Sequence, residues 1–186
     1  MNFAEKVDQF LEAQFPNLTT SIYRDLSLNF KKILEEGPFE PTERFQNLLA
    51  AAVTLENNEI AKLAIGVLKE LGTSEEIIRE SAEVAGIMGM NNVYYKFRSY
   101  LPPESKDNYT RAGLRMQSLA KPVSGKKTFE GMAMTVSVVN GCPMCIVAHE
   151  KAMIHEGFTT EQVHELARLA SVCKGLTSLK KAQFVL

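Results

Sequence analysis

Apolar residues recur at spacings of three and four along most of the chain, which is the period of an amphipathic helix. The segments with this spacing are Phe3–Phe15, Ile22–Leu34, Phe45–Leu55, Ile60–Leu71, Ile77–Ile87, Met132–Val139 and Val163–Val172. No convincing run alternates between apolar and polar residues, as a half-buried strand would. We therefore predict an all-α fold.

Turn-forming residues separate these segments, as expected where helices end. They are Gly37-Pro38, Asn57-Asn58, Gly72, Pro102-Pro103, Asn140-Gly141 and Gly157. Two helix starts have the spacing of a capping box, in which a threonine and the Glu or Gln three residues later bind each other's backbone N–H groups. These pairs are Thr73 with Glu76 and Thr159 with Gln162.

The second half of the chain repeats the order and spacing of turn residues and helix caps found in the first half. The alignment pairs Phe45 with Phe129, Asn57 with Gly141 and, after one extra residue in the second copy, Gly72 with Gly157. Both copies then consist of a helix, a tight turn, a helix, a glycine stop and a capped helix. We predict a single helical domain over residues 1–186 with an internal duplication, the first half spanning about 40–100 and the second about 125–180.

The two copies differ at positions where the second copy has side chains that can take part in catalysis. In this alignment the second copy has Glu130, Cys142, Cys145 and His149 where the first has Gln46, Asn58, Ala61 and Ile65. The first copy is therefore interpreted as scaffold, and the second as the half that carries the chemistry.

Composition narrows the class of protein. The 186 residues include 21 Lys and Arg and 22 Asp and Glu, and the formal net charge is −1. A chain so close to neutral, without a basic stripe, does not indicate a nucleic-acid partner. No apolar run is long enough to cross a bilayer, and the N-terminus lacks the apolar centre of a signal peptide. We therefore expect no membrane partner and a cytoplasmic location.

Two of the three cysteines, Cys142 and Cys145, are separated by only two residues. Three cysteines make a poor disulfide framework, and in a reducing compartment such a pair is more often redox-active or metal-binding than structural. Pro143 suits the first position of a helix, so we predict Cys142 at or just before the helix start and Cys145 in its first turn. The helix macrodipole and the unpaired N–H groups at this end favour a thiolate.

His149 and Glu130 are the predicted helpers of the cysteine pair. His149 follows Cys145 by one helical turn on the same face, where it can accept the thiol proton. If the turn at Asn140-Gly141 folds two helices back antiparallel, Glu130 comes to lie near His149 and can orient it or relay a proton. The expected reaction is attack of a thiolate on a peroxide, resolution of the sulfenic acid to a disulfide, and reduction of that disulfide by an external dithiol.

The cysteine pair also has a metal-binding interpretation. A C-x-x-C pair can form half of a zinc site, but structural zinc commonly has four ligands and the sequence has no second pair. Cys173, in an apolar run, is interpreted as a small buried hydrophobe, and His155 and His164 as surface residues. The methionines are interpreted as core filler rather than copper ligands; they include Met88, Met90, Met116, Met132 and Met134.

The pattern of Glu130, eleven residues, Cys142-x-x-Cys145, three residues and His149 resembles the signature of the alkyl hydroperoxidase D family, within the carboxymuconolactone decarboxylase-like superfamily. The segments Met88–Tyr95 and Gly113–Met116 also resemble the longer members of that family. The resemblance runs from about residue 40 to the C-terminus, and the first 35 residues are less diagnostic.

The resemblance implies an all-α fold of two similar halves, a homotrimer, and an antioxidant peroxidase site with no bound metal or cofactor. Cys145 would be the peroxidatic thiol that becomes a sulfenic acid, and Cys142 the more exposed resolving thiol and proton donor. Glu130 and His149 would form the proton relay. The implied partners are an organic hydroperoxide, a peroxiredoxin (the peroxidase component of alkyl hydroperoxide reductase) and, as electron donor, a lipoylated dihydrolipoamide acyltransferase.

Met144 stands where members of the family often carry a histidine, so one possible proton acceptor is missing. This favours an alternative in which Cys142 and Cys145 pass electrons between protein partners, as a redox adaptor with little direct peroxidase activity. A cofactor-free decarboxylase of the wider superfamily is disfavoured, because that chemistry has no use for a cysteine pair.

Overall fold

The computed structural model describes residues 3–183, and every regular element within them is a helix. The α-helices are α1 (Phe3–Gln14), α2 (Ser21–Glu35), α3 (Pro41–Thr54), α4 (Asn58–Glu70), α5 (Glu75–Tyr100), α6 (Pro103–Lys106), α7 (Lys126–Asn140), α8 (Pro143–His155) and α9 (Thr160–Ala182). Two short 3₁₀ helices, η1 (Asp107–Tyr109) and η2 (Gln117–Ala120), lie between α6 and α7. The predicted all-α fold is confirmed. Within residues 3–183, no helix is long and apolar enough to cross a membrane.

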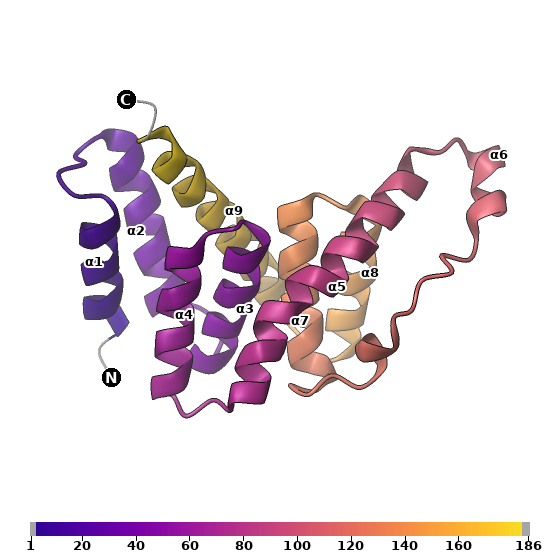
Figure 1. Cartoon of the computed structure of the whole chain (residues 1–186), viewed down its shortest axis with the longest axis horizontal. Coiled ribbons are helices and arrows are strands. Elements are labelled where there is room, and N and C mark those ends of the chain that lie inside the picture. Colours follow the sequence, from indigo (N-terminus) through magenta and orange to yellow (C-terminus); the bar gives the residue numbers. More distant parts are fainter. Residues whose placement is uncertain (1–2, 184–186) are drawn as a thin grey trace.

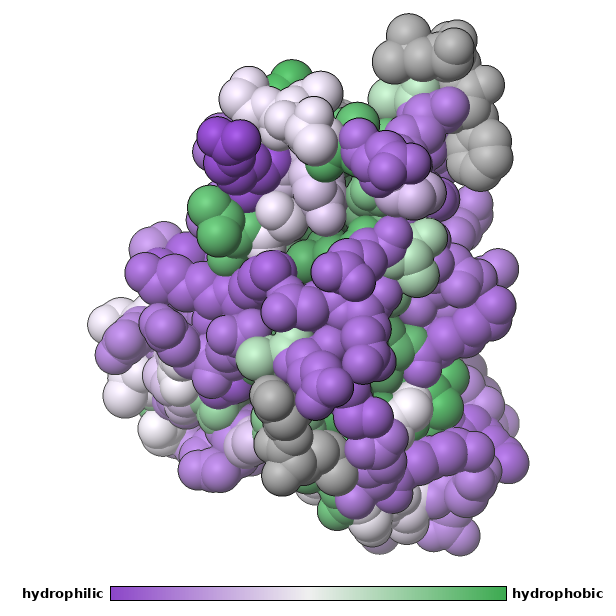
Figure 2. Space-filling model, turned by 90° about the vertical axis from the view of Figure 1, so that its left-hand side faces the viewer, coloured by the Kyte–Doolittle hydropathy of each residue, from purple (hydrophilic) through white to green (hydrophobic). Residues whose placement is uncertain are grey.

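Helices α3 and α7 form the centre of the molecule, where they pack against each other and both contact α5 and α9 (Figure 1). Every residue of α3 from Arg44 to Ala52 is buried, and so is every residue of α7 from Gly131 to Ser137. A helix buried on all sides has mostly small or apolar residues around its circumference rather than one apolar stripe. The buried Arg44 is an exception, and its guanidinium donates to the carbonyls of Leu34 and Phe39. Helices α4, α5, α8 and α9 pack against this pair, and the face on the side of α1 and α2 is mostly hydrophilic (Figure 2).

Side chains predicted to be core residues are mostly buried. Met88, Met132 and Met134 belong to the hydrophobic core, whereas Met90 and Met116 are only partly buried. Cys173 is fully buried, as predicted, and packs among apolar residues of α9 and its neighbours. His155 and His164 are exposed, as predicted.

Helix α5 is much longer than the predicted segment Ile77–Ile87 and continues to Tyr100. Its C-terminal end leaves the body of the molecule, and residues 97–115, here called the arm, extend away from the other helices and turn back (Figure 1). Phe97, Tyr100, Tyr109 and Leu114 of the arm are exposed. The apolar spacing ends well before the helix ends, because two of the buried positions, Asn91 and Asn92, carry polar side chains.

The two halves contain the same order of elements, and their turns have matching backbone geometry. Glu56 and Gly141 both have left-handed backbones, with φ of 57° and 61°. The next residues, Asn57 and Cys142, are the N-caps of α4 and α8, with φ/ψ of −97°/88° and −99°/99°. Each N-cap amide donates to the carbonyl five residues earlier, on Ala52 and Ser137 respectively.

The predicted alignment pairs Asn57 with Gly141, whereas the structure pairs the two N-caps, Asn57 and Cys142. The prediction is one residue out of register here because it relies on identical residues such as Phe45 and Phe129. Helix α5 is capped by Ser74 rather than by the predicted Thr73, whereas the predicted capping box of Thr159 and Gln162 is confirmed. The caps Ser74 and Thr159 have the same separation as Asn57 and Cys142, so the halves align without an extra residue. The positions equivalent to Glu130, Cys142, Cys145 and His149 are then Phe45, Asn57, Ile60 and Ala64. The first half is still without thiols, and the duplication itself stays a prediction.

The left-handed backbone at Glu56 gives a prediction about stability. Glu56→Gly should raise the free energy of unfolding by about 0.5–1 kcal/mol, because relief of the left-handed steric cost exceeds the entropy that glycine adds to the unfolded chain. Urea unfolding followed by circular dichroism measures this change. The control Glu83→Gly, at an exposed helical position of α5, should lower stability by about 1 kcal/mol. A destabilised Glu56→Gly variant would contradict the role given to this turn.

Candidate active site

The turn between α7 and α8 fixes the position of the cysteine pair. Helix α7 ends at Gly141, whose left-handed backbone costs glycine little because it has no Cβ. The amide of Gly141 donates to the Val138 carbonyl, and that of Cys142 to the Ser137 carbonyl at 3.1 Å, which is the Schellman pattern of helix termination. Pro143 then begins α8, so the predicted place of Cys142 at the start of a helix is confirmed.

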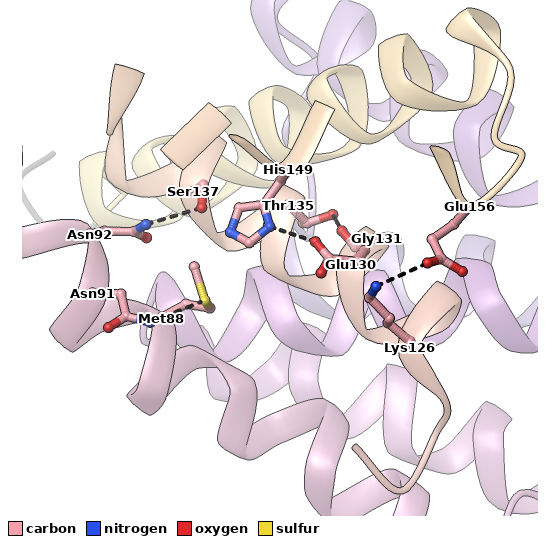
Figure 3. Close-up of polar contacts among 10 residues, drawn as sticks. All are labelled: Met88, Asn91, Asn92, Lys126, Glu130, Gly131, Thr135, Ser137, His149 and Glu156. Carbon is pink, nitrogen blue, oxygen red and sulfur yellow. Dashed lines mark hydrogen bonds and ion pairs between the residues drawn. The ribbon is translucent and has the colours of Figure 1, made fainter. Parts of the chain in front are cut away.

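Side chains of α5 hold this turn from one side. Asn92 donates to Ser137 Oγ at 3.0 Å and accepts from Asn140 Nδ2 at 2.9 Å, and Figure 3 shows the bond to Ser137. One turn further along, Lys96 Nζ donates to the Asn140 carbonyl at 3.2 Å. A cation here offsets the negative end of the α7 macrodipole directly beside the cysteine pair.

The two cysteines meet at the amino end of α8. The Cys145 amide donates to Cys142 Sγ at 3.3 Å, which makes Cys142 the N-cap of the helix. The two sulfurs are bonded as a disulfide, with Cα atoms 5.3 Å apart. A Cys142 thiolate formed on reduction would keep a backbone N–H donor and the positive end of the helix macrodipole, both of which favour the charged form.

The exposure of the two cysteines is the reverse of the expectation. Cys142 is 0% exposed and Cys145 is 5% exposed, and only Cys145 lines the neighbouring cavity. The expectation that Cys142 is the more exposed thiol is therefore wrong in this structure. The reason is the N-cap geometry, which folds the Cys142 side chain back over the first turn of α8.

His149 and Glu130 lie together, as predicted from the turn. His149 Nδ1 is 2.7 Å from Glu130 Oε2, and each side chain is 17% exposed. A carboxylate only accepts hydrogen bonds, so Nδ1 carries the proton and a neutral ring has its free lone pair on Nε2. Figure 3 shows that second nitrogen pointing away from Glu130, toward the side where Met88 and Asn91 of α5 lie.

A mostly apolar cavity of about 350 Å³ adjoins the disulfide. Its lining residues are Met144, Cys145, Ala148 and His149 of α8, Met88, Asn91 and Tyr95 of α5, and Met116 and Leu119 of the segment before α7. Cys145 and His149 thus open onto one space, where a bound molecule can reach both. Within residues 3–183, no three His, Cys, Asp or Glu side chains are grouped so that they could hold a metal ion.

The segment that carries Met116 and Leu119 is anchored to α5. Glu80 accepts two hydrogen bonds with its carboxylate, from the backbone amides of Val123 at 2.6 Å and Ser124 at 2.7 Å. Two consecutive amides on one carboxylate hold the chain at a fixed distance from α5.

The sequence predicts no role for two walls of the cavity. One is the α5 wall, formed by Met88, Asn91 and Tyr95, and the other is the Met116–Leu119 wall. From the sequence, Met88 and Met116 are interpreted as core filler, although both face the cavity. The available signal is the resemblance of the segments Met88–Tyr95 and Gly113–Met116 to members of a known family, because the first segment supplies all three α5 residues of the lining and the second contains Met116.

Comparison with known proteins agrees with this resemblance. A model of the carboxymuconolactone decarboxylase family matches residues 109–185. An alkyl hydroperoxide reductase AhpD of Anaeromyxobacter dehalogenans (strain 2CP-C) is 35% identical over 153 residues, covering 80% of this chain and 79% of the relative. The AhpD protein of Coxiella burnetii (strain RSA 493 / Nine Mile phase I) is 34% identical over 159 residues, or 84% of this chain and 89% of the relative. That of Rhodospirillum centenum is 30% identical over 177 residues, or 95% and 91%.

The third cysteine gives a prediction about thiol reactivity. Burial raises the pKa of the Cys173 thiol to about 12, so almost none of it is thiolate at pH 8. Alkylation of Cys173 in the folded, reduced protein should be at least about 1,000-fold slower than in urea, where a free cysteine has a pKa near 8.5. Mass spectrometry of labelled peptides measures the rate, with Cys145 as the reactive reference. Equal labelling of Cys173 and Cys145 in the folded protein would show that Cys173 is not sealed in the core.

Proposed function

This chain belongs to the alkyl hydroperoxide reductase AhpD family, among the carboxymuconolactone decarboxylase-like proteins, and on that premise we propose that it is an antioxidant dithiol enzyme. Its reaction is the reduction of organic hydroperoxides through the pair Cys142 and Cys145. The observation that carries the proposal is that Cys145 and the Glu130-bound His149 open onto the same cavity.

The first step is attack of Cys145 on the peroxide. Nε2 of His149 takes the thiol proton, and the thiolate attacks the terminal oxygen of the hydroperoxide, ROOH. The O–O bond breaks, Cys145 becomes a sulfenic acid, and the departing alkoxide takes the proton from the imidazolium and leaves as the alcohol ROH. Glu130 stabilises the imidazolium through the 2.7 Å bond to Nδ1.

The second step resolves the sulfenic acid. The Cys142 thiol attacks the sulfur of Cys145, the S–O bond breaks, and the hydroxyl leaves as water with the Cys142 proton. The product is the disulfide of the present structure, in which the two Cα atoms are 5.3 Å apart. Because the N-cap geometry already holds Cys142 over the first turn of α8, this step needs no rearrangement of the helices.

The third step regenerates the dithiol by exchange with an external dithiol. A donor thiolate attacks one sulfur of the disulfide and forms a mixed disulfide, and the other cysteine leaves as a thiol. The second donor thiol then attacks the mixed disulfide, so that the donor becomes a disulfide and both cysteines of this chain are thiols again. Attack at Cys145 fits the geometry, since this cysteine lines the cavity and its departing partner Cys142 is a stabilised N-cap thiolate. We propose that the donor is a lipoylated dihydrolipoamide acyltransferase, and that the dithiol in turn reduces a peroxiredoxin partner, the peroxidase component of alkyl hydroperoxide reductase.

We also propose that the chain assembles as a homotrimer. The support from this chain is the arm, which projects from the body with Phe97, Tyr100, Tyr109 and Leu114 exposed. Exposed aromatic and aliphatic side chains gathered on one projecting segment are typical of a surface covered by another protein chain.

A redox adaptor is the second candidate function, and Met144 favours it. This thioether lines the cavity in place of a proton acceptor, so His149 is left to accept the thiol proton by itself. The two candidates differ in the rate at which a hydroperoxide alone oxidises the reduced dithiol. Slow oxidation by hydroperoxide, together with a mixed disulfide trapped between a single-cysteine variant and a protein partner, would favour the adaptor.

The peroxidase proposal predicts the effect of removing single groups. Cys145→Ser should abolish consumption of cumene hydroperoxide with dihydrolipoamide as donor, because serine provides no thiolate. His149→Gln should lower the rate by about 100-fold or more, the usual contribution of a general acid–base group. The control Cys173→Ala should keep the activity. Peroxide consumption that survives Cys145→Ser would exclude the proposed mechanism.

A further inference from the structure

Asn91 of α5 is buried with an unpaired polar group. It is 4% exposed, and its side-chain oxygen has no hydrogen-bond partner within residues 3–183. Its side-chain nitrogen donates to the Met88 sulfur at 4.0 Å, and a thioether is a weak acceptor. An amide left without partners lowers the stability of a folded protein, so its presence calls for another explanation.

The neighbouring residue shows what a structural asparagine looks like at this place. Asn92 is 1% exposed, but it donates to Ser137 and accepts from Asn140, so both ends of its amide are bonded. The fold therefore uses Asn92 to hold the turn between α7 and α8. It makes no comparable use of the amide of Asn91.

Asn91 faces the space where the proposed chemistry occurs. It lines the cavity together with Cys145 and His149, between Met88 and Tyr95 on the same face of α5. Figure 3 shows Asn91 and Met88 on the side of the His149 ring that points away from Glu130. The rest of the lining is mostly apolar, so the amide is one of few groups there that can bind a polar ligand.

We propose that Asn91 binds the hydroperoxide group of the substrate, an inference that rests on the proposed function. A hydroperoxide, R–O–O–H, has one donor and two acceptors, and an amide matches it with one acceptor and two donors. The terminal O–H donates to the Asn91 oxygen, while the Asn91 nitrogen donates to the inner oxygen. The terminal bond of an asparagine side chain has a broad torsional minimum, so the amide can turn to make both contacts.

This arrangement orients the peroxide for the reaction. The terminal oxygen, which Cys145 attacks, is held by the amide oxygen, and the inner oxygen, which leaves as the alkoxide, receives an N–H donor as its charge develops. The alkyl chain then lies against Met116, Leu119 and Met144. The site thus suits hydroperoxides with an apolar substituent better than hydrogen peroxide.

The variant Asn91→Leu tests the proposal, because leucine has a similar volume and no polar atoms. The rate at which tert-butyl hydroperoxide oxidises the reduced protein in a single turnover, followed by mass spectrometry of the disulfide, should fall by about 10-fold or more, because two hydrogen bonds are lost and each is worth up to about 10-fold. Resistance to urea should stay the same or increase, since an unpaired buried amide is removed. The control variant Cys173→Ala, at a buried position that does not line the cavity, should leave the rate of the peroxide step unchanged.

The matched control is Asn92→Leu, which breaks two bonds in the structure and should lower the urea midpoint. Asn91→Met provides a second apolar variant with a more adaptable side chain, should leucine disturb folding. Either of two results would overturn the proposal. One is an Asn91→Leu protein that is less stable but has an unchanged rate of the peroxide step, and the other is a stable Asn91→Met protein with an unchanged rate. If peroxide does not oxidise even the unmodified protein, the proposed function fails and this inference fails with it. If peroxide oxidises the unmodified protein and both variants at one rate, the inference alone fails.

Discussion

A single reversal of the chain at Gly141 determines how the chemical groups of this protein meet. The left-handed backbone of Gly141 and the Cys142–Ser137 hydrogen bond end α7 and start α8 with almost no intervening chain. The two helices therefore return alongside each other, and Glu130 on the first reaches His149 on the second at 2.7 Å. The same reversal makes Cys142 the N-cap of α8. One backbone conformation thus positions the acid, the imidazole and the thiol pair together.

Local signals in the sequence predict this part of the site, because each residue of the turn acts through its own backbone chemistry. Asn140-Gly141 indicates the reversal, Pro143 indicates the helix start, and the spacing from Cys145 to His149 indicates a shared face. The positions of most helices follow from apolar periodicity in the same way. Helices α5 and α9 are exceptions, because both continue well beyond their predicted ends at Ile87 and Val172. In α5 the buried asparagines interrupt the apolar pattern on which the predicted end depends.

The cavity could not be predicted in the same way, because its walls come from segments far apart in the sequence. Met88, Asn91 and Tyr95 approach α8 only through the packing of α5 against α7 and α8. Periodicity identifies which side of a helix is buried, but not whether that side meets tightly packed side chains or an open space. The burial of Cys142 depends on the direction of one side chain at the N-cap, which residue spacing does not specify.

The hydrogen bonds from Val123 and Ser124 to Glu80 have a consequence for access to the sulfur atoms. Helix α5 supplies one wall of the cavity itself and holds the chain that forms another, so these bonds tie the two walls together. Helix α8, which carries Cys145, supplies a further wall and is not held by these two bonds. A shift of α5 would therefore move its own wall and the Met116–Leu119 wall together relative to Cys145.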